Sequence, residues 1–252
     1  MKNYLIETAL LSQGLRSISD DNLLTSWNYP DARLVWLEKG KVITGPLAAF
    51  LPVRQQANQL RRIDAASLAD ARNQKATGAL TASATMAICQ EMQIPLAVTC
   101  GMGGIGPRPA VTIGSDLIAL QQWQVILIAA APKDVFDLQT TLDWLRHHGV
   151  RIVGANNDIC DGFLIKGPSY RLDGTITDLP HTPPLLILNG LAQRPVTTNE
   201  LKNAMREGDA AVQQGGYYHP AVNQKLDEDT QGASSQEQLK GLLANIGLAE
   251  RL

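Results

Sequence analysis

One lysine comes directly after an apolar segment, in a position where its amine could be partly desolvated and therefore reactive. Residues 125–134 read VILIAAAPKD, so Lys133 follows a strand-like run, three alanines and a proline. An amine is nucleophilic only when neutral, and a partly desolvated site lowers its pKa toward that state. A solvated lysine at the end of a strand gives the same pattern, so the segment leaves both interpretations open.

A carboxylate interrupts the first apolar segment of the chain. Glu7 follows Tyr4, Leu5 and Ile6 directly. Burying a carboxylate in a sheet is costly unless it has a partner. Glu7 is therefore either a paired structural residue or a general acid with a raised pKa, and the residues alone fit both.

Two segments rich in small residues have the composition of anion-binding backbone. Residues 100–108 (CGMGGIGPR) follow an apolar run, and closely spaced glycines let N–H groups converge on a phosphate that Arg108 could clamp. They lack the GK[ST] of a P-loop and the later acidic residue of a dinucleotide fingerprint. Residues 78–86 (GALTASATM) carry hydroxyls that could donate to phosphate or sugar oxygens. A plain turn in the first segment and tight helix-to-sheet packing in the second explain the same residues.

The elements that must position these residues alternate between short apolar and amphipathic segments, which is typical of α/β proteins. The pattern predicts strands at 4–6, 33–38, 94–100, 125–131, 151–155 and 184–188, and helices at 82–92, 135–148, 198–214 and 235–251. Continuous apolar runs indicate strands covered on both faces, so we expect a three-layer α/β/α fold with a largely parallel central sheet. Ligands of such sheets bind at the carboxyl ends of strands, where Lys133 lies. The polar, turn-rich residues 215–234 are predicted to form a loop or a flap.

Composition narrows the classes of protein. With 252 residues and 44% hydrophobic content, the chain is expected to form a single domain over residues 1–252. The net charge of −2, with no basic stripe, argues against a nucleic-acid partner. Three widely spaced cysteines without a CxxC pair indicate buried thiols in a reducing compartment, and the four histidines lack metal-ligand spacing. With no secretory signal and no run long enough to span a bilayer, we expect a cytoplasmic protein without a membrane partner.

Together, these segments resemble the pseudouridine-5'-phosphate glycosidases, also called the indigoidine synthase A-like family. LIETALLSQGL is similar to ALESTIIAHGM, GALTASATMAI to GATTVAATM, and CGMGGIG to GGIGGVH. SDL followed by AAAPKDVFDLQTTLDWL is similar to SADL followed by CAGAKSILDIPRTLEYL, with the same spacing from Asp116 to Lys133. LLANIGL resembles the family's ANIAL. The resemblance extends from Glu7 to Asn245, with a shorter N-terminal part and a shorter segment before the last helix.

The resemblance implies an enzyme that reversibly cleaves the C–C glycosidic bond of pseudouridine 5'-phosphate, or a related C-ribosyl phosphate, to a free base and ribose 5-phosphate. Lys133 matches the family's nucleophile, which forms a Schiff base, Glu7 its proton donor and Asn245 a late asparagine that orients the substrate. A homotrimer is also implied. Two alternatives stay open: a C-glycosynthase that joins ribose 5-phosphate to a different carbon nucleophile, and a non-catalytic phosphosugar-binding protein.

The resemblance and the small-residue segments also give a set of substrate-binding candidates: Arg62, Thr81, Ala82, Thr99, Gly103, Gly104, Arg108, Gly114, Ser115 and Asp116. Arg62 stands near the family's substrate-binding lysine and replaces a flexible ammonium with a planar fork. The family's divalent metal is manganese, but Thr112 occupies the position of the aspartate that holds it, and a neutral hydroxyl is a poor ligand for a hard cation. Gly106 stands where the family has a histidine, which makes Arg108 the candidate for its phosphate contact.

Overall fold

A curled, largely parallel sheet forms the centre of the protein. The computed structural model describes residues 3–57, 59–106, 112–178 and 181–252. Within them, nine strands follow the order β10-β13-β8-β6-β1-β2-β5-β4, and β3 pairs with β2. Their bounds are β1 Tyr4–Ile6, β2 Leu34–Glu38, β3 Lys41–Gly45, β4 Arg61–Ile63, β5 Gly78–Leu80, β6 Leu96–Val98, β8 Ile126–Ala129, β10 Arg151–Gly154 and β13 Leu185–Leu188. The pairing is parallel except where β2 meets β3 and β5.

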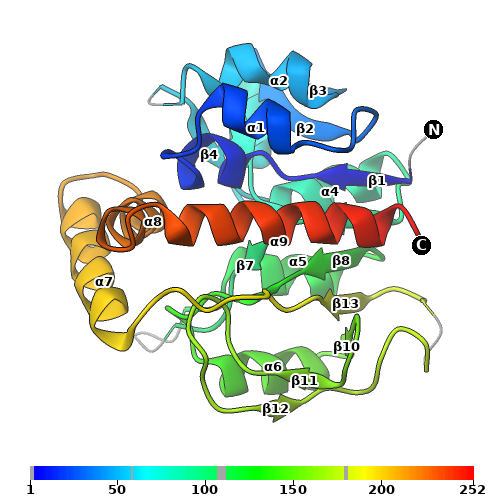
Figure 1. Cartoon of the computed structure of the whole chain (residues 1–252). Coiled ribbons are helices and arrows are strands. Elements are labelled where there is room, and N and C mark those ends of the chain that lie inside the picture. The colour runs from blue at the N-terminus through cyan, green and yellow to red at the C-terminus, as the bar shows by residue number, and fades with distance from the viewer. Residues whose placement is uncertain (1–2, 58, 107–111, 179–180) are drawn as a thin grey trace.

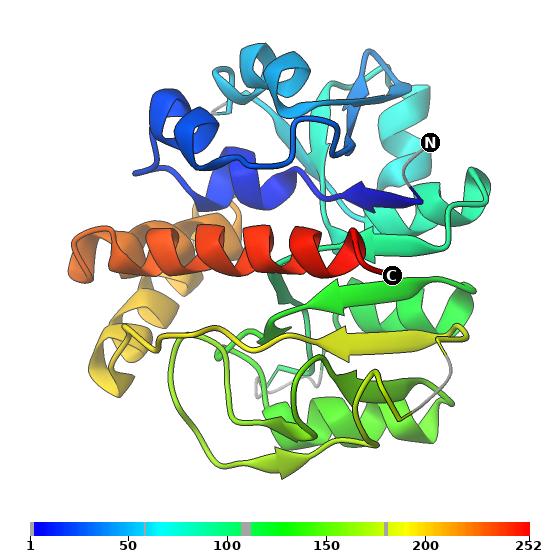
Figure 2. The same cartoon turned by 45° about the vertical axis from the view of Figure 1, so that its right-hand side comes forward.

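Helices cover both faces of this sheet (Figures 1 and 2). The long helix α9 (Ala233–Ala249) crosses one face against β6 and β8, while α4 (Ala82–Glu91) and α5 (Ser115–Gln122) lie on the other. The remaining helices are η1 Leu10–Gly14, α1 Asp20–Ser26, α2 Leu47–Arg54, α3 Leu68–Asn73, α6 Leu138–His147, α7 Thr198–Gln213 and α8 Tyr218–Asp229. The prediction of a three-layer α/β/α fold with a largely parallel sheet is therefore confirmed.

Two short parallel strands continue β6 and β8 beyond the main sheet. β7 (Gly101–Met102) pairs with β9 (Ala131–Pro132), and the backbone N–H of Lys133 donates to the carbonyl of Met102 at 3.1 Å. A second small pair, β11 (Ile159–Cys160) and β12 (Tyr170–Arg171), is antiparallel. The β7–β9 pair matters for function because it places Lys133 beside the glycine segment at the carboxyl ends of the parallel strands.

Strand β5, which is antiparallel to β2, also ends at the carboxyl ends of the parallel strands. The reason is that β2 begins where β1 stops. Ile6 pairs with Leu34, the first residue of β2, so β5 runs back along β2 toward the carboxyl end of β1. Thr8 joins the two ends: its N–H donates to the Leu80 carbonyl at 3.2 Å, and its hydroxyl accepts from the Leu80 N–H at 3.0 Å. Residues that follow β1, β5 and β9 are thereby brought to one place.

The segments predicted from periodicity agree with the structure. Each of the six predicted strands contains an observed strand of the central sheet, and helices α4, α6, α7 and α9 match the four predicted helices. Gly149, which follows the second of these helices, has a φ of 77°, a left-handed conformation that favours glycine. Cys89, Cys100 and Cys160 are buried free thiols, as expected.

The prediction of a loop over residues 215–234 is wrong, because Tyr218–Asp229 form helix α8. Val222 and Leu226 are buried on one side of it, four residues apart, among otherwise polar neighbours. Gly208 of α7 permits close packing of the two helices, since a Cβ there would lie 2.5 Å from the Tyr218 ring. Tertiary contact with α7 therefore stabilises a helix whose own sequence is weakly amphipathic.

Several short elements were not predicted at all: α1, α2, α3, α5, β3, β4 and β5. The strands among them are three to five residues long, too short to establish a period. None of the helices in the described part of the chain is long and apolar enough to cross a membrane.

Candidate active site

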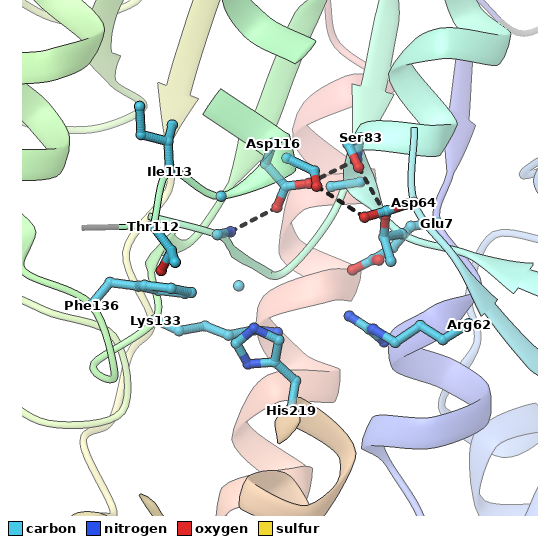
Figure 3. A pocket seen from close by; sticks show the side chains of 16 residues that line it. Glu7, Arg62, Asp64, Ser83, Thr112, Ile113, Asp116, Lys133, Phe136 and His219 are labelled. Carbon is cyan, nitrogen blue, oxygen red and sulfur yellow. Dashed lines mark hydrogen bonds between the residues drawn. The ribbon is translucent and has the colours of Figure 1, made fainter. Parts of the chain in front are cut away.

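A cavity of about 280 Å³ opens at the edge where these strand ends meet (Figure 3). Its lining comes from β-strand ends, the first turns of α4 and α5, and the start of α8: Glu7, Arg62, Asp64, Thr81, Ala82, Ser83, Gly101, Gly103, Thr112, Ile113, Gly114, Ser115, Asp116, Lys133, Phe136 and His219. Both predicted reacting groups, Lys133 and Glu7, are among them. The cavity is therefore the candidate active site.

Lys133 extends into the cavity from the end of β9. Desolvation by the surrounding protein lowers the pKa of its amine, and the positive charge of Arg62 lowers it further, while Glu7 acts in the opposite direction. Gly101 makes room for the stem of the side chain, since a Cβ at that position would lie 3.0 Å from Lys133 Cγ. The site thus favours the neutral amine that nucleophilic attack requires.

Glu7 lies just beyond β1 and is 5% exposed. The Thr99 hydroxyl donates to its Oε1. Desolvation raises the pKa of the carboxyl group, although Lys133, the Thr99 hydroxyl and Arg62 each favour the ionised form. A raised pKa extends the pH range over which the carboxyl group keeps a proton that it can give to a substrate atom, as a general acid must.

Arg62 enters the cavity from the side opposite Lys133, from the middle of β4 (Figure 3). It lies beside Glu7, and its charge contributes to the pKa shifts of both Glu7 and Lys133. An arginine can bind a phosphate through two parallel N–H donors. This position supplies a fixed positive charge facing the amine.

Asp116 connects the glycine segment to the start of α4. Its Oδ1 accepts the backbone N–H of Ser83 at 2.8 Å, and its Oδ2 accepts that of Gly103 at 2.7 Å. Gly114, which precedes α5, donates its N–H to the Gly104 carbonyl at 3.0 Å. Asp116 lines the cavity, and both of its oxygens already have partners within the protein.

A second set of hydroxyl and carboxylate contacts orders the same wall of the cavity (Figure 3). Asp64 accepts the Ser115 hydroxyl at 3.0 Å and the Ser67 hydroxyl at 2.7 Å. The hydroxyls of Thr81 and Ser83 lie 3.0 Å apart. These bonds hold the first turns of α4 and α5 against the cavity, with no side-chain cap on either helix. Two helix N-termini facing one cavity favour a bound anion.

Some predicted residues lie elsewhere. Thr99 and Asn245 are fully buried behind the cavity, and Gly104 packs against Phe136 and Thr141 without lining it. Arg108 falls outside the described residues. Asn245 is not among the lining residues, and its Nδ2 donates to the Thr99 carbonyl at 2.7 Å.

Four lining residues lie outside the segments and positions singled out from the sequence: Asp64, Ile113, Phe136 and His219. Phe136 comes three residues after Lys133, and its ring centroid lies 5.6 Å from that of His219. His219 was expected in a loop, and only the formation of α8 brings it to the cavity. No sequence signal could have placed it there, because its position depends on how α8 packs.

The residues present do not fit a resident divalent metal of the kind that the family resemblance implies. Thr112, at the family's metal position, lines the cavity with a neutral hydroxyl. The carboxylate oxygens of Asp64 and Asp116 already accept protein donors. Within the described ranges, no cluster of three histidine, cysteine, aspartate or glutamate side chains could hold a metal ion. A hard cation requires several free oxygen ligands, and the cavity does not provide them.

Comparison with known proteins gives the family. Residues 35–182 match the family model of indigoidine synthase A-like proteins. The chain belongs to this family. It is 25% identical over 234 residues to a pseudouridine-5'-phosphate glycosidase of Alkaliphilus metalliredigens, covering 85% of this chain and 76% of that protein. A protein of the same name from Geobacillus kaustophilus is 30% identical over 199 residues, which cover 71% of this chain and 66% of the relative.

Two solved structures share the fold of this family member. An indigoidine synthase A-like protein from Thermotoga maritima superimposes with a TM-score of 0.82 at 19% identity, covering 100% of this chain and 92% of that one. The prealnumycin C-glycosynthase AlnA in complex with ribulose 5-phosphate gives a TM-score of 0.73 at 17% identity, covering 98% and 88% of the two chains. The family resemblance is confirmed, and the protein is an enzyme of this family.

Proposed function

We propose that this enzyme cleaves, reversibly, the C–C glycosidic bond of pseudouridine 5'-phosphate or a related C-ribosyl phosphate, through an imine between Lys133 and the sugar. One observation carries the proposal: Lys133 and Glu7 reach the same cavity beside Arg62, with the amine pKa lowered and the carboxyl pKa raised. Perturbed titratable groups that share a cavity are typical of catalytic pairs. The names of the related glycosidases support the same substrate class.

The phosphate is assigned to the wall formed by α4 and α5. The first turns of both helices border the cavity, and Ser83 and Ser115 are among its lining residues. Backbone N–H groups at these helix ends and the Arg62 guanidinium together match a phosphate dianion. A phosphate held there would keep the sugar at a fixed distance from Lys133, so binding energy would orient the reacting carbon.

Because the base is attached through carbon, protonating a heteroatom of the base cannot release it. In the proposed reaction, Lys133 Nζ bonds to C1' as the C1'–O4' bond breaks, and Glu7 gives O4' its proton. Glu7 then takes a proton from the new amine and passes it to the base carbon. The C1'–base bond breaks, its electron pair stays with the base, and the nitrogen lone pair forms the C1'=N bond. Water adds to this iminium, releases ribose 5-phosphate and returns a proton to Glu7.

A second candidate is synthesis, in which the same imine accepts a carbon nucleophile other than uracil. The observations that favour it are the structural likeness to a C-glycosynthase and the hydroxyl of Thr112 at the family's metal position. The lysine chemistry is identical in the two directions. The candidates differ in the partner that enters or leaves at C1'.

Reductive trapping tests the proposal. With ribose 5-phosphate and borohydride, the enzyme should gain one sugar-phosphate mass on Lys133, and Lys133→Arg, which keeps the charge, should gain none. Release of uracil from pseudouridine 5'-phosphate would support cleavage, whereas an adduct without any reaction of uracil would favour the synthase. Stabilisation by ribose 5-phosphate with an unmodified Lys133 would instead indicate a non-catalytic binding protein and overturn the proposal.

A further inference from the structure

A chain of amide hydrogen bonds leads from the edge of the sheet to Glu7. Asn156 Nδ2 donates to Asn189 Oδ1 at 3.3 Å, and Asn189 Nδ2 donates to Asn245 Oδ1 at 3.0 Å. Asn245 Nδ2 then donates to the Thr99 carbonyl at 2.7 Å, and the Thr99 hydroxyl donates to Glu7. We name these four residues, Asn156, Asn189, Asn245 and Thr99, the amide relay.

The Thr99 carbonyl fixes the orientation of every side-chain amide in the amide relay. The Thr99 carbonyl can only accept, so Asn245 must present its NH₂ group there and its oxygen to Asn189. Asn189 must therefore present its own NH₂ group to Asn245, which leaves its oxygen for Asn156. All donors consequently point in one direction, toward a carboxylate that can only accept when ionised.

Thr99 is the residue through which the relay reaches the carboxyl group. It follows β6 directly, its N–H donates to the Ile128 carbonyl at 2.9 Å, and its carbonyl is held by Asn245. With both backbone groups bonded and the side chain fully buried, its hydroxyl has little freedom to turn away from Glu7. The direction of the hydrogen bond to Glu7 thus depends on Asn245, which lies on α9.

We propose that Asn245, supported by Asn189, is a positioning residue that holds the Thr99 hydroxyl on Glu7 and so helps set where this carboxyl group titrates. Asn245 is fully buried and does not line the cavity, so it acts on the carboxyl group and not on a substrate. The role of Glu7 as a proton donor rests on the proposed function. The effect of Asn245 on the Glu7 pKa does not, because it can be measured in the protein without substrate.

Other charged groups also act on Glu7 and must be kept constant in any test. Lys133 reaches it from the end of β9, Arg62 from β4 and Asp116 from α5, and the Cys100 thiol lies next to Thr99. His219 of α8 and Asp64, which follows β4, line the same cavity. None of these side chains belongs to the amide relay, so replacing a relay residue leaves their charges unchanged.

The test is the titration of Glu7, followed by NMR in protein labelled with ¹³C at glutamate carboxyl groups and assigned with Glu7→Gln. A donor to a carboxylate favours the ionised form, so Thr99→Val should raise the Glu7 pKa by roughly one unit. Asn245→Leu should shift it in the same direction by a smaller amount. In the double variant, Asn245→Leu should add nothing to Thr99→Val, because its effect passes through that hydroxyl.

A matched control lies two turns earlier on the same helix. Gln238 is also fully buried, and neither of its side-chain polar atoms has a hydrogen-bond partner within the described part of the chain. Gln238→Leu makes the same chemical change in α9 without touching the amide relay, so the Glu7 pKa should not move. Asn189→Leu, at a partly exposed site, supplies a second relay variant if Asn245→Leu does not fold.

The inference would be overturned if the Glu7 pKa were unchanged in Asn245→Leu and Asn189→Leu. It would also be overturned if their shifts added to that of Thr99→Val. In either case Asn245 would be a packing residue. The proposed function fails separately, through the absence of a ribose 5-phosphate adduct on Lys133 in the wild-type enzyme. If adducts form, the pH profile of trapping should move with the Glu7 pKa in the relay variants but not in Gln238→Leu.

Discussion

The Asp116 carboxylate accepts the backbone N–H of Gly103 at 2.7 Å and, through its other oxygen, the N–H of Ser83 at 2.8 Å. A residue from the first turn of α5 therefore fixes both the glycine segment and the start of α4. The sequence resemblance implies contact between Asp116 and substrate. The structure adds that this carboxylate shapes the wall to which we assign the phosphate.

Replacing Asp116 with asparagine should loosen that wall. An amide can accept only one of the two N–H groups and presents its own NH₂ to the other, so a donor faces a donor. We expect a loss of about 1.5–3 kcal/mol in the free energy of unfolding, the range for a hydrogen bond to a charged group. Chemical denaturation measures it, and ribose 5-phosphate should also bind more weakly in calorimetry.

Asp143→Asn is a suitable control for Asp116→Asn. Asp143 is half exposed and lies 3.6 Å from Arg146 in a surface ion pair, so its replacement should change stability by less than about 1 kcal/mol. Equal effects of the two substitutions would contradict the structural role given to Asp116.

The pH dependence of stability should report the burial of Glu7. Its native pKa is raised above the ordinary 4.5, so the native state binds more protons than the unfolded state just above that pH. The contribution of Glu7 to the free energy of unfolding is fully present below pH 4.5, and it is lost as the pH rises through the native pKa. Glu7→Gln removes the effect, so the free energy of unfolding of the variant relative to wild type should rise across this window.

Denaturation at a series of pH values checks this prediction. Lys133 has a lowered pKa and contributes with the opposite slope at higher pH, because stability rises with pH where the native amine has lost its proton and the unfolded amine still holds one. Comparing Glu7→Gln with wild type at each pH removes that contribution to first order. A variant that loses stability relative to wild type as pH rises would mean that Glu7 and Lys133 form a buried ion pair instead.

The sequence was sufficient for the parts of the site that follow long apolar strands. Lys133 could be placed at the end of a strand because 125–131 is a continuous apolar run, and Glu7 because it follows the first one. The residues that follow short strands were harder to place. Asp64 comes after a three-residue strand, β4, whose period cannot be recognised, so its position in the cavity had no signal.

The contributions of α8 and α9 could not be read from the sequence, because they depend on packing between distant segments. His219 lines the cavity from the first turn of α8, which packs closely on α7 where Gly208 leaves room for Tyr218. Asn245 was identified by motif, but the motif does not reveal that its amide bonds to Thr99, 146 residues earlier in the chain. Motifs thus identify residues, whereas the tertiary contacts decide whether a residue faces substrate or another side chain.

Gly101→Ala should disturb Lys133 without touching its amine. A Cβ at this position would lie 3.0 Å from Lys133 Cγ and 2.6 Å from Phe163 Cζ, so the lysine stem or the ring must shift. We expect a loss of about 1–3 kcal/mol in stability, as for other overpacked cores, and slower trapping with ribose 5-phosphate. Thermal denaturation and the trapping rate measure these effects.

Gly190→Ala is the matched control for this glycine. It is exposed, and a Cβ there would meet only the end of the Arg194 side chain, at 3.6 Å. Stability should change by no more than about 0.5 kcal/mol, and trapping should proceed at the wild-type rate. A Gly101→Ala enzyme that traps the sugar phosphate as fast as this control would argue against a tightly positioned lysine.

Chelation should leave the lysine chemistry intact. The Thr112 side chain offers a neutral hydroxyl, and Asp64 and Asp116 direct their oxygens to protein donors, so we expect no divalent ion to be needed. After dialysis against EDTA, the rate of adduct formation on Lys133 should stay within about twofold of the untreated enzyme, and added Mn²⁺ should not raise it. Asp116→Asn, treated identically, should be no more sensitive to EDTA than wild type, because its carboxylate binds backbone and not metal. A tenfold loss that Mn²⁺ reverses would show that the cavity acquires a metal when the sugar phosphate binds, with the phosphate itself as the missing ligand.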